Sequence, residues 1–156
     1  MSELTIGREA PDFTLPASSG ENIRLSDLKG KNVVLYFYPK DMTSSCTTQA
    51  CDFRDRHSDF SEANAVILGI SLDPINRHEK FIDKYNLPFL LLTDEEHRVC
   101  ELYGVWQMKQ MYGKQYMGIV RSTFVIDTDG VLVKEWRKVK VRGHIEEVLQ
   151  YVKENL

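Results

Sequence analysis

The chain has 156 residues, a formal net charge of −3, and charged residues spread along its whole length. A chain of this size and mixed composition can bury one compact core, so we expect residues 1–156 to form a single domain. The near balance of 20 basic and 23 acidic residues creates no field that would attract nucleic acid or an anionic membrane, so we expect neither as a partner.

The apolar segments are short, and the N-terminus does not have the pattern of a secretion signal. The two longest apolar runs, 33–38 and 65–70, fall far short of the ~20 residues that a membrane-spanning helix needs. The first residues have neither a basic start nor an apolar middle. We therefore expect a cytoplasmic protein that does not enter the membrane.

The elements expected along the chain alternate between strands and helices. A hairpin or short helix is expected around residues 10–30. Continuous apolar runs, typical of strands buried on both faces of a sheet, follow at 33–38, 66–70 and 89–92. Helical patterns occur at about 46–62, 75–85, 95–106 and 143–154. The segments 122–126 and 131–136, joined by an Asp-Gly turn, predict a β-hairpin. The fold class is therefore α/β, with a mixed central sheet flanked by helices and an N-terminal extension.

The three cysteines raise the question of function. Reducing compartments disfavour structural disulfides, so the close pair Cys46 and Cys51 is expected to be catalytic, redox-active or metal-binding. Cys100 lies beside a helical apolar stripe within 99–106. We interpret Cys100 as a partly buried packing residue and only a reserve partner for another cysteine.

Cys46 stands where a buried strand gives way to a helix. The chain leaves the strand at 33–38, turns at Pro39 and enters the helix near residue 45 or 46. In open α/β sheets, ligands gather beyond the carboxyl ends of strands, and a helix N-terminus there offers unpaired N–H groups and a partial positive charge. Such a setting stabilises a thiolate, which is the nucleophilic form of cysteine. We therefore predict that Cys46 is a nucleophile rather than a core residue.

The same segment resembles a known family. The pattern Pro39-x-x-x-Thr43-x-x-Cys46 matches the peroxiredoxin active-site motif, and 36–43 is similar to the bacterioferritin comigratory protein or peroxiredoxin Q branch. The likeness covers nearly the whole chain, including the segments Ala10–Phe13, Leu25–Gly30, Tyr103–Trp106 and Arg121–Ile126. It implies a thioredoxin-like fold and a thiol-dependent peroxidase that reduces hydrogen peroxide and organic hydroperoxides.

The resemblance also implies a role for five residues. Cys46 corresponds to the cysteine that attacks the peroxide, and Cys51 to a resolving cysteine on the same helix. Thr43 corresponds to the hydroxyl that touches thiolate and peroxide, Pro39 to the residue that shields the pocket, and Arg121 to a cation distant in sequence. The resulting intramolecular disulfide would be reduced by thioredoxin or a similar dithiol. The family works without a cofactor or metal, and we expect a monomer.

The sequence departs from the family pattern at two places. Ser44-Ser45 stands where many relatives have Pro-Gly, which removes a rigid turn and adds two side chains that favour N-cap positions. The helix start is therefore expected to be positioned differently. Gln49 replaces a glutamate of many peroxiredoxins and removes a carboxylate that would pair with Arg121. A more cationic pocket is expected.

Two other functions remain open from the residues alone. A thiol-disulfide oxidoreductase of thioredoxin type would share the fold, but it normally carries Cys-x-x-Cys at the helix start. A metal-binding or holdase module would use Cys46, Cys51 and His57, although zinc sites need about four well-placed ligands. We expect all four histidines to be solvated surface residues, namely His57, His78, His97 and His144. No glycine-rich nucleotide motif is present in the sequence.

Helix geometry makes a conformational prediction. On one regular helix, a five-residue offset places Cys46 and Cys51 ~7.5 Å apart along the axis and ~140° apart around it. A disulfide needs Cα atoms within ~7 Å and side chains that point toward each other. Oxidation of this pair is therefore expected to unwind part of the helix.

Overall fold

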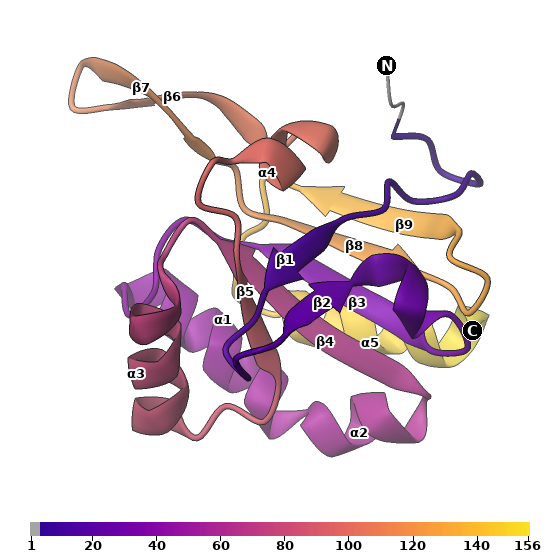
Figure 1. Ribbon diagram of the computed structural model, residues 1–156. Helices are drawn as coiled ribbons and strands as arrows, with labels where there is room; N and C mark the ends of the chain where they lie inside the picture. Colours follow the sequence, from indigo (N-terminus) through magenta and orange to yellow (C-terminus); the bar gives the residue numbers. More distant parts are fainter. Residues whose placement is uncertain (1–3) are drawn as a thin grey trace.

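A five-stranded mixed sheet forms the centre of the computed structural model, which describes residues 4–156 (Figure 1). The strand order is β5-β4-β3-β8-β9. The bounds are Asn32–Phe37 for β3, Ala65–Ser71 for β4, Leu90–Thr93 for β5, Ser122–Ile126 for β8 and Leu132–Arg137 for β9. β3, β4 and β5 are parallel, whereas β8 runs antiparallel to both β3 and β9. The predicted mixed sheet and its C-terminal hairpin are confirmed.

Strand β3 is central because every one of its residues is apolar or buried. All six positions are buried, and the strand pairs with β4 on one side and with β8 on the other, Leu35 facing both Leu68 and Phe124. Leu35 and Phe37 contribute to one apolar core, while Tyr36 contributes to the core on the opposite face. The sheet therefore separates two hydrophobic cores.

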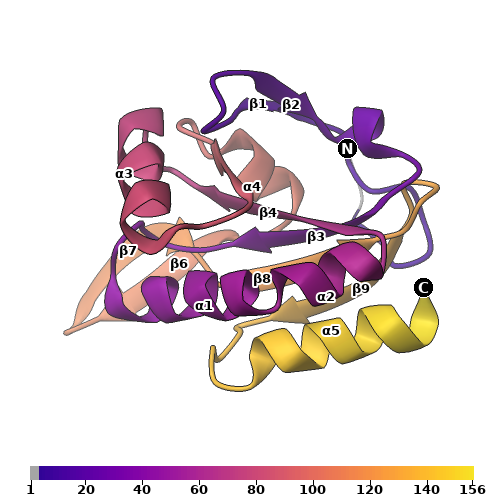
Figure 2. The same cartoon turned by 90° about the horizontal axis from the view of Figure 1, so that it is seen from below.

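Helices and the N-terminal segment cover the two faces. α1 (Ser44–Asp55), α2 (His57–Glu62) and α5 (His144–Asn155) lie on the face to which Tyr36 points (Figure 2). β1 (Thr14–Pro16), β2 (Asn22–Arg24), the 3-10 helix η1 (Leu25–Leu28) and α4 (Arg98–Leu102) lie on the other face. α3 (Ile75–Tyr85) stands beside β5 at one edge. The expected N-terminal extension thus contains both a hairpin and a short helix.

An aromatic cluster fastens α1 to the sheet. The Tyr36 ring lies 4.6 Å from the Phe53 ring and 5.3 Å from the Tyr38 ring, centroid to centroid. A Cβ atom at position 69 of the neighbouring strand would lie 2.9 Å from the Tyr36 ring, so Gly69 is required for this close approach. The cluster fixes the helix that carries both cysteines of interest.

Two predicted helices are shorter than expected. The helix predicted over 46–62 is divided at Arg56, whose φ of −107° and ψ of 7° lie outside the helical region. The helix predicted over 95–106 covers only Arg98–Leu102. It starts after His97, which has a left-handed φ of 52°, and Gly104 with a φ of 69° prevents its continuation. Apolar periodicity alone does not predict these local breaks in the backbone.

A third hairpin was not predicted. β6 (Trp106–Met111) and β7 (Lys114–Ile119) pair with each other only, through a turn in which Tyr112 and Gly113 both have positive φ. The hairpin extends away from the central sheet (Figure 1). Most of its residues are exposed, and its strands lack the continuous apolar runs by which the central strands were recognised. The Tyr-Gly turn was the one local signal.

The prediction of four solvated histidines is wrong for two of them. His78 is fully buried and His144 is 5% exposed, whereas His57 and His97 are partly exposed. Both buried rings have hydrogen-bond partners, and such partners offset the loss of hydration. Within residues 4–156, no helix is long and apolar enough to cross a membrane.

Candidate active site

Cys46 lies in the first turn of α1, beyond the carboxyl end of β3. The Tyr38 amide still donates to the Ile70 carbonyl at 3.1 Å, so the sheet ladder ends there, and Pro39 starts the turn. The helix begins at Ser44, and its first hydrogen bond joins the Thr47 amide to the Thr43 carbonyl. The predicted strand-turn-helix setting of Cys46 is therefore confirmed, with the helix starting one or two residues earlier than expected.

The serines do not cap this helix, contrary to expectation. The N-cap residue is Thr43, and no side chain caps the helix there. Ser44 and Ser45 are the first two residues inside α1, and both are exposed. The backbone of Thr43 already has the extended conformation that an N-cap needs, with φ −77° and ψ 159°. Thr43 therefore occupies the N-cap position, and both serines lie inside the helix.

Arg121 reaches the sulfur of Cys46. The Arg121 Nη2 atom lies 3.3 Å from Cys46 Sγ, and Nη1 donates to Gln49 Oε1 at 2.6 Å. Arg121 directly precedes β8, which is the neighbour of β3 in the sheet, so two residues 75 positions apart meet at one site. A guanidinium donor at this distance stabilises negative charge on the sulfur. Cys46 is only 1% exposed.

Gln49 keeps the arginine in place without neutralising it. Its amide oxygen accepts from Arg121, whereas its Nε2 atom is buried and has no hydrogen-bond partner within residues 4–156. A second cation lies nearby: burial, together with the positive charge of Arg121, lowers the pKa of Lys109, while Cys46 opposes that shift. Lys109 belongs to the hairpin β6–β7 and was not identified from the sequence.

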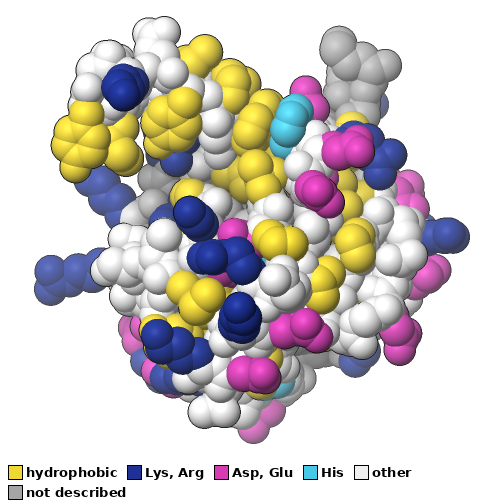
Figure 3. Space-filling model, turned by 60° about the vertical axis from the view of Figure 1, so that its left-hand side comes forward, with side chains coloured by type: hydrophobic (Ala, Val, Ile, Leu, Met, Phe, Trp, Pro, Cys, Tyr) yellow, Lys and Arg dark blue, Asp and Glu magenta, His cyan; other side chains and the backbone are white. Residues whose placement is uncertain are grey.

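Pro39 and Thr43 line the turn before the helix. Pro39 is half-buried, directly after the buried Tyr38. The Thr43 side chain is exposed, and its Oγ1 donates to the Lys40 carbonyl at 2.9 Å. Because its proton is held by this carbonyl, the hydroxyl oxygen remains available as an acceptor. Figure 3 shows lysine and arginine side chains below the hydrophobic hairpin.

The three cysteines differ in their surroundings. All are free thiols. Cys51 is half-buried on α1, and burial raises its pKa, with Asp55 and Asp52 adding to the shift and Arg54 opposing it. Cys100 is fully buried in the core on the other face of the sheet from Cys46, and burial raises its pKa strongly. The predicted packing role of Cys100 is confirmed, and the sheet separates it from Cys46.

A model of the AhpC/TSA family matches residues 6–135 of the chain. The chain belongs to this peroxiredoxin family. It is 58% identical over 151 residues to peroxiredoxin Bcp of Bacillus subtilis, covering 97% of this chain and 96% of that protein. It is 43% identical over 155 residues to peroxiredoxin Bcp of Escherichia coli K12, with 99% of each chain covered. These relatives confirm the resemblance to the bacterioferritin comigratory protein branch.

Solved structures of this peroxiredoxin branch have the same fold. Xanthomonas campestris peroxiredoxin Q superposes with a TM-score of 0.90 at 40% identity, covering 96% of this chain and 98% of that one. The structures of X. campestris bacterioferritin comigratory protein, which concern alkyl peroxide reduction by that protein, give the same values. The predicted thioredoxin-like fold is therefore confirmed. Membership of this family identifies the chain as a thiol-dependent peroxidase rather than a thiol-disulfide oxidoreductase of thioredoxin type or a metal-binding module.

Proposed function

We propose that Cys46 is the peroxidatic cysteine of this thiol-dependent peroxidase and that Cys51 resolves it. The Cys46 thiolate attacks one peroxide oxygen, the O–O bond breaks, and the leaving oxygen takes a proton to give water or an alcohol. Cys46 is left as a sulfenic acid. The Cys51 sulfur then displaces the hydroxyl group as water, forming an intramolecular disulfide that an external dithiol reduces by exchange.

The contact between Arg121 and Cys46 supports the first step most directly. A donor 3.3 Å from the sulfur is also within reach of a peroxide oxygen bound against that sulfur. Preorganised donors of this kind stabilise the charge that develops as the O–O bond breaks. We propose that the Thr43 oxygen accepts the peroxide O–H while its own proton stays with Lys40, and that half-buried Pro39 limits water access.

The surroundings of Cys51 support the order of the two steps. Burial raises the pKa of Cys51, so in the folded helix it is a protonated thiol and a weak nucleophile. Unwinding of α1 would expose Cys51 to water, remove the cause of that shift and bring the two sulfurs together. Resolution would thus follow the peroxide step and not compete with it.

The substrates we propose are hydrogen peroxide and organic hydroperoxides, and the proposed reductant is thioredoxin or a similar dithiol. The alkyl peroxide reduction of the X. campestris relative supports organic hydroperoxides. The short polar turn at 39–45, exposed at Lys40 and Thr43, supports access for a small peroxide. We further propose that the chain works as a single-domain monomer in the cytoplasm.

Replacement of each cysteine by serine tests the assignment. Cys46→Ser is expected to abolish peroxide consumption, because no other thiol touches Arg121. Cys51→Ser is expected to react once with peroxide and to stop at a sulfenic acid, which mass spectrometry detects with a thiol-blocking or sulfenate-trapping reagent. Cys100→Ser, at the other side of the sheet, is the control and should retain turnover. Substantial activity in Cys46→Ser would overturn the proposal.

A further inference from the structure

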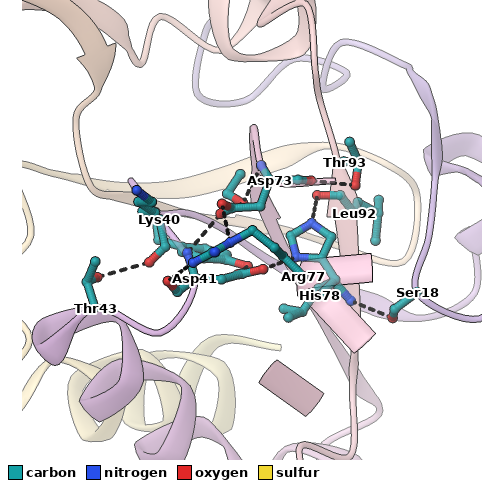
Figure 4. A network of polar contacts seen from close by, with 12 residues as sticks. Ser18, Lys40, Asp41, Thr43, Asp73, Arg77, His78, Leu92 and Thr93 are labelled. Atoms are coloured by element: carbon teal, nitrogen blue, oxygen red, sulfur yellow. Dashed lines mark hydrogen bonds and ion pairs between the residues drawn. The ribbon is translucent and has the colours of Figure 1, made fainter. Parts of the chain in front are cut away.

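A buried carboxylate-imidazole pair joins the turn before Cys46 to α3. His78 Nδ1 lies 2.6 Å from Asp41 Oδ2, and His78 Nε2 lies 3.0 Å from the Leu92 carbonyl oxygen (Figure 4). Both side chains are fully buried. The Tyr38 hydroxyl donates to the other carboxylate oxygen of Asp41 at 2.5 Å. Neither Asp41 nor His78 belongs to the machinery assigned above.

The partners determine where the protons lie. A backbone carbonyl can only accept, so His78 Nε2 carries a hydrogen and donates it to Leu92. One further proton lies between His78 Nδ1 and Asp41. Every polar atom of both side chains is therefore hydrogen-bonded, so that the pair is compensated although it is buried.

A second carboxylate holds the backbone of the same turn. Asp73 Oδ2 accepts from the Asp41 amide at 2.8 Å and from the Ser71 hydroxyl at 2.7 Å. The Arg77 guanidinium donates to the Asp41 carbonyl at 3.2 Å and forms an ion pair with Asp73 at 3.4 Å (Figure 4). Both the backbone and the side chain of Asp41 are thus tied to β4, β5 and α3, which do not carry the reactive cysteines.

The residue that follows Asp41 has an unfavourable backbone conformation. Met42 has a φ of 65°, which a non-glycine residue adopts only where its surroundings hold it there. Thr43, the N-cap of α1, comes next. If Asp41 were released, Met42 could relax to a negative φ, and the start of α1 would move with it.

We propose that Asp41 and His78 are positioning residues that hold the N-terminal end of α1 and so set the balance between the folded, peroxide-reactive state and the unwound, disulfide-forming state. This inference rests on the proposed roles of Cys46 and Cys51. In this arrangement, unwinding during resolution stays within 43–55, between the anchored Asp41 and the helix break at Arg56. The anchor returns Thr43 and Cys46 to their places after each reduction.

The test compares His78→Leu with Phe81→Leu. Phe81 is also fully buried on α3 but takes no part in the polar network, so its replacement reports the effect of lost stability alone. Two quantities are measured: the rate constant for oxidation of the reduced protein by hydrogen peroxide in stopped flow, and the fraction of Cys46 that becomes sulfinic acid per turnover by mass spectrometry. The sulfinic fraction reports the competition between two reactions of the Cys46 sulfenate: over-oxidation in the folded state and disulfide formation with Cys51 in the unwound state.

His78→Leu leaves the Asp41 carboxylate buried without its partner, so we expect peroxide oxidation to slow about tenfold or more. Because the unwound state gains population, the sulfinic fraction should fall several-fold. Phe81→Leu should leave both quantities within about twofold of the parent at a temperature where both variants are folded. His78→Gln keeps one amide donor for Asp41 and should give intermediate values.

If His78→Leu does not fold, Asp41→Asn and His78→Gln provide the same comparison against Phe81→Leu, with smaller shifts in the same directions. If the Asp41 and His78 variants had the same oxidation rates and the same sulfinic fractions as Phe81→Leu, the proposed positioning role of Asp41 and His78 would be overturned. That result would leave the role of Cys46 untouched, since the proposed nucleophile stands or falls with Cys46→Ser. The two failures are therefore distinguishable.

Discussion

At the level of single side chains, the guanidinium of Arg121 serves two partners at once. One nitrogen contacts Cys46 Sγ and the other donates to Gln49, and this use of two nitrogens depends on the planar, forked shape of arginine. Gln49 holds the fork in position but brings no negative charge. The positive charge of Arg121 is therefore directed at the sulfur and at any peroxide bound against it.

Replacement of Arg121 is expected to slow the peroxide step. Arg121→Gln removes both the cation and the donor near the sulfur, and loss of one such donor costs about 100-fold or more in rate. Arg121→Lys should recover little, since a single ammonium cannot serve Cys46 and Gln49 together. Stopped-flow oxidation by hydrogen peroxide measures both variants. The control is Arg137→Gln, which alters an arginine that donates to the Tyr103 and Gly104 carbonyls. An oxidation rate for Arg121→Gln equal to that of this control would contradict the assignment.

The sequence identified some residues of the site and missed others. Cys46, Pro39 and Thr43 lie within eight positions, so a local motif identified the turn, and Arg121 was found through its place in a second motif. Asp41 and His78 are 37 positions apart and meet only because α3 packs beside the turn. No local pattern marks such a pair. The burial of His78 did have a local signal, since His78 lies three residues after Ile75 and three before Phe81, the spacing of one face of a helix.

Among the elements, α1 carries both Cys46 and Cys51 and is the part of the fold that would change in the proposed mechanism. Its N-terminal end is tied through the turn at Asp41, its last turn is packed through Phe53, and the helix ends before Arg56. The break before α2 was not expected from the sequence. The proposed unwinding of α1 would end at this break and would leave in place the packing of α2, whose Phe60 is fully buried.

Amide hydrogen exchange should detect this change. With α1 intact, Cys46 and Cys51 are too far apart along and around the helix for a disulfide, so the oxidised protein must lose hydrogen bonds in α1. Exchange across 44–55 is expected to be slow in the reduced protein and much faster in the oxidised one, while the amides of α2 remain protected in both. Equal protection of α1 in the two redox states, with the disulfide verified by mass spectrometry, would exclude unwinding.

The hairpin β6–β7 shows why one element could not be predicted. Its strands pair only with each other, and large apolar side chains on it are exposed, namely Met108, Met111, Tyr112, Tyr116 and Met117. Patterns of burial predict strands because one face usually packs on a core, whereas this hairpin packs on the core only at its base, through Trp106 and Ile119, within the part of the chain that the structure describes. The central strands, which are buried on both sides, were recognised from their apolar runs for the same physical reason.

At the scale of the whole molecule, the sheet places Cys46 and the helix that carries Cys51 on one face and Cys100 on the other. α5 closes the face that carries the thiols, and its first residue, His144, bonds to Thr123 of β8 at 2.8 Å. Thr123 pairs with Tyr36 across the sheet. The start of the last helix is therefore linked through two strands to the core beneath α1.

The burial of His144 makes stability depend on pH. Burial lowers the pKa of His144 to about 4, with the positive charge of Arg121 adding to the shift and Glu147 opposing it. In the unfolded chain a histidine takes up its proton near pH ~6.5. Between that pH and about 4, the unfolded state binds more protons than the folded state. The free energy of unfolding therefore falls as the pH decreases through this window, by up to about 1.4 kcal/mol per pH unit, and the contribution is fully present above it.

Urea unfolding of the reduced protein at several pH values between 7.5 and 4.5 tests this dependence. His144→Gln keeps a polar side chain facing Thr123 but has no proton to gain, so its stability should fall less steeply toward acid than that of the parent. Leu149→Ala, which shortens a buried side chain of the same helix, should lower stability at every pH and keep the parental slope, because it removes no titrating group. If His144→Gln and Leu149→Ala had the same slope, the buried imidazole would not be the source of the acid sensitivity. If only His144→Gln flattens the curve, the imidazole buried between α5 and β8 is the source of the acid sensitivity.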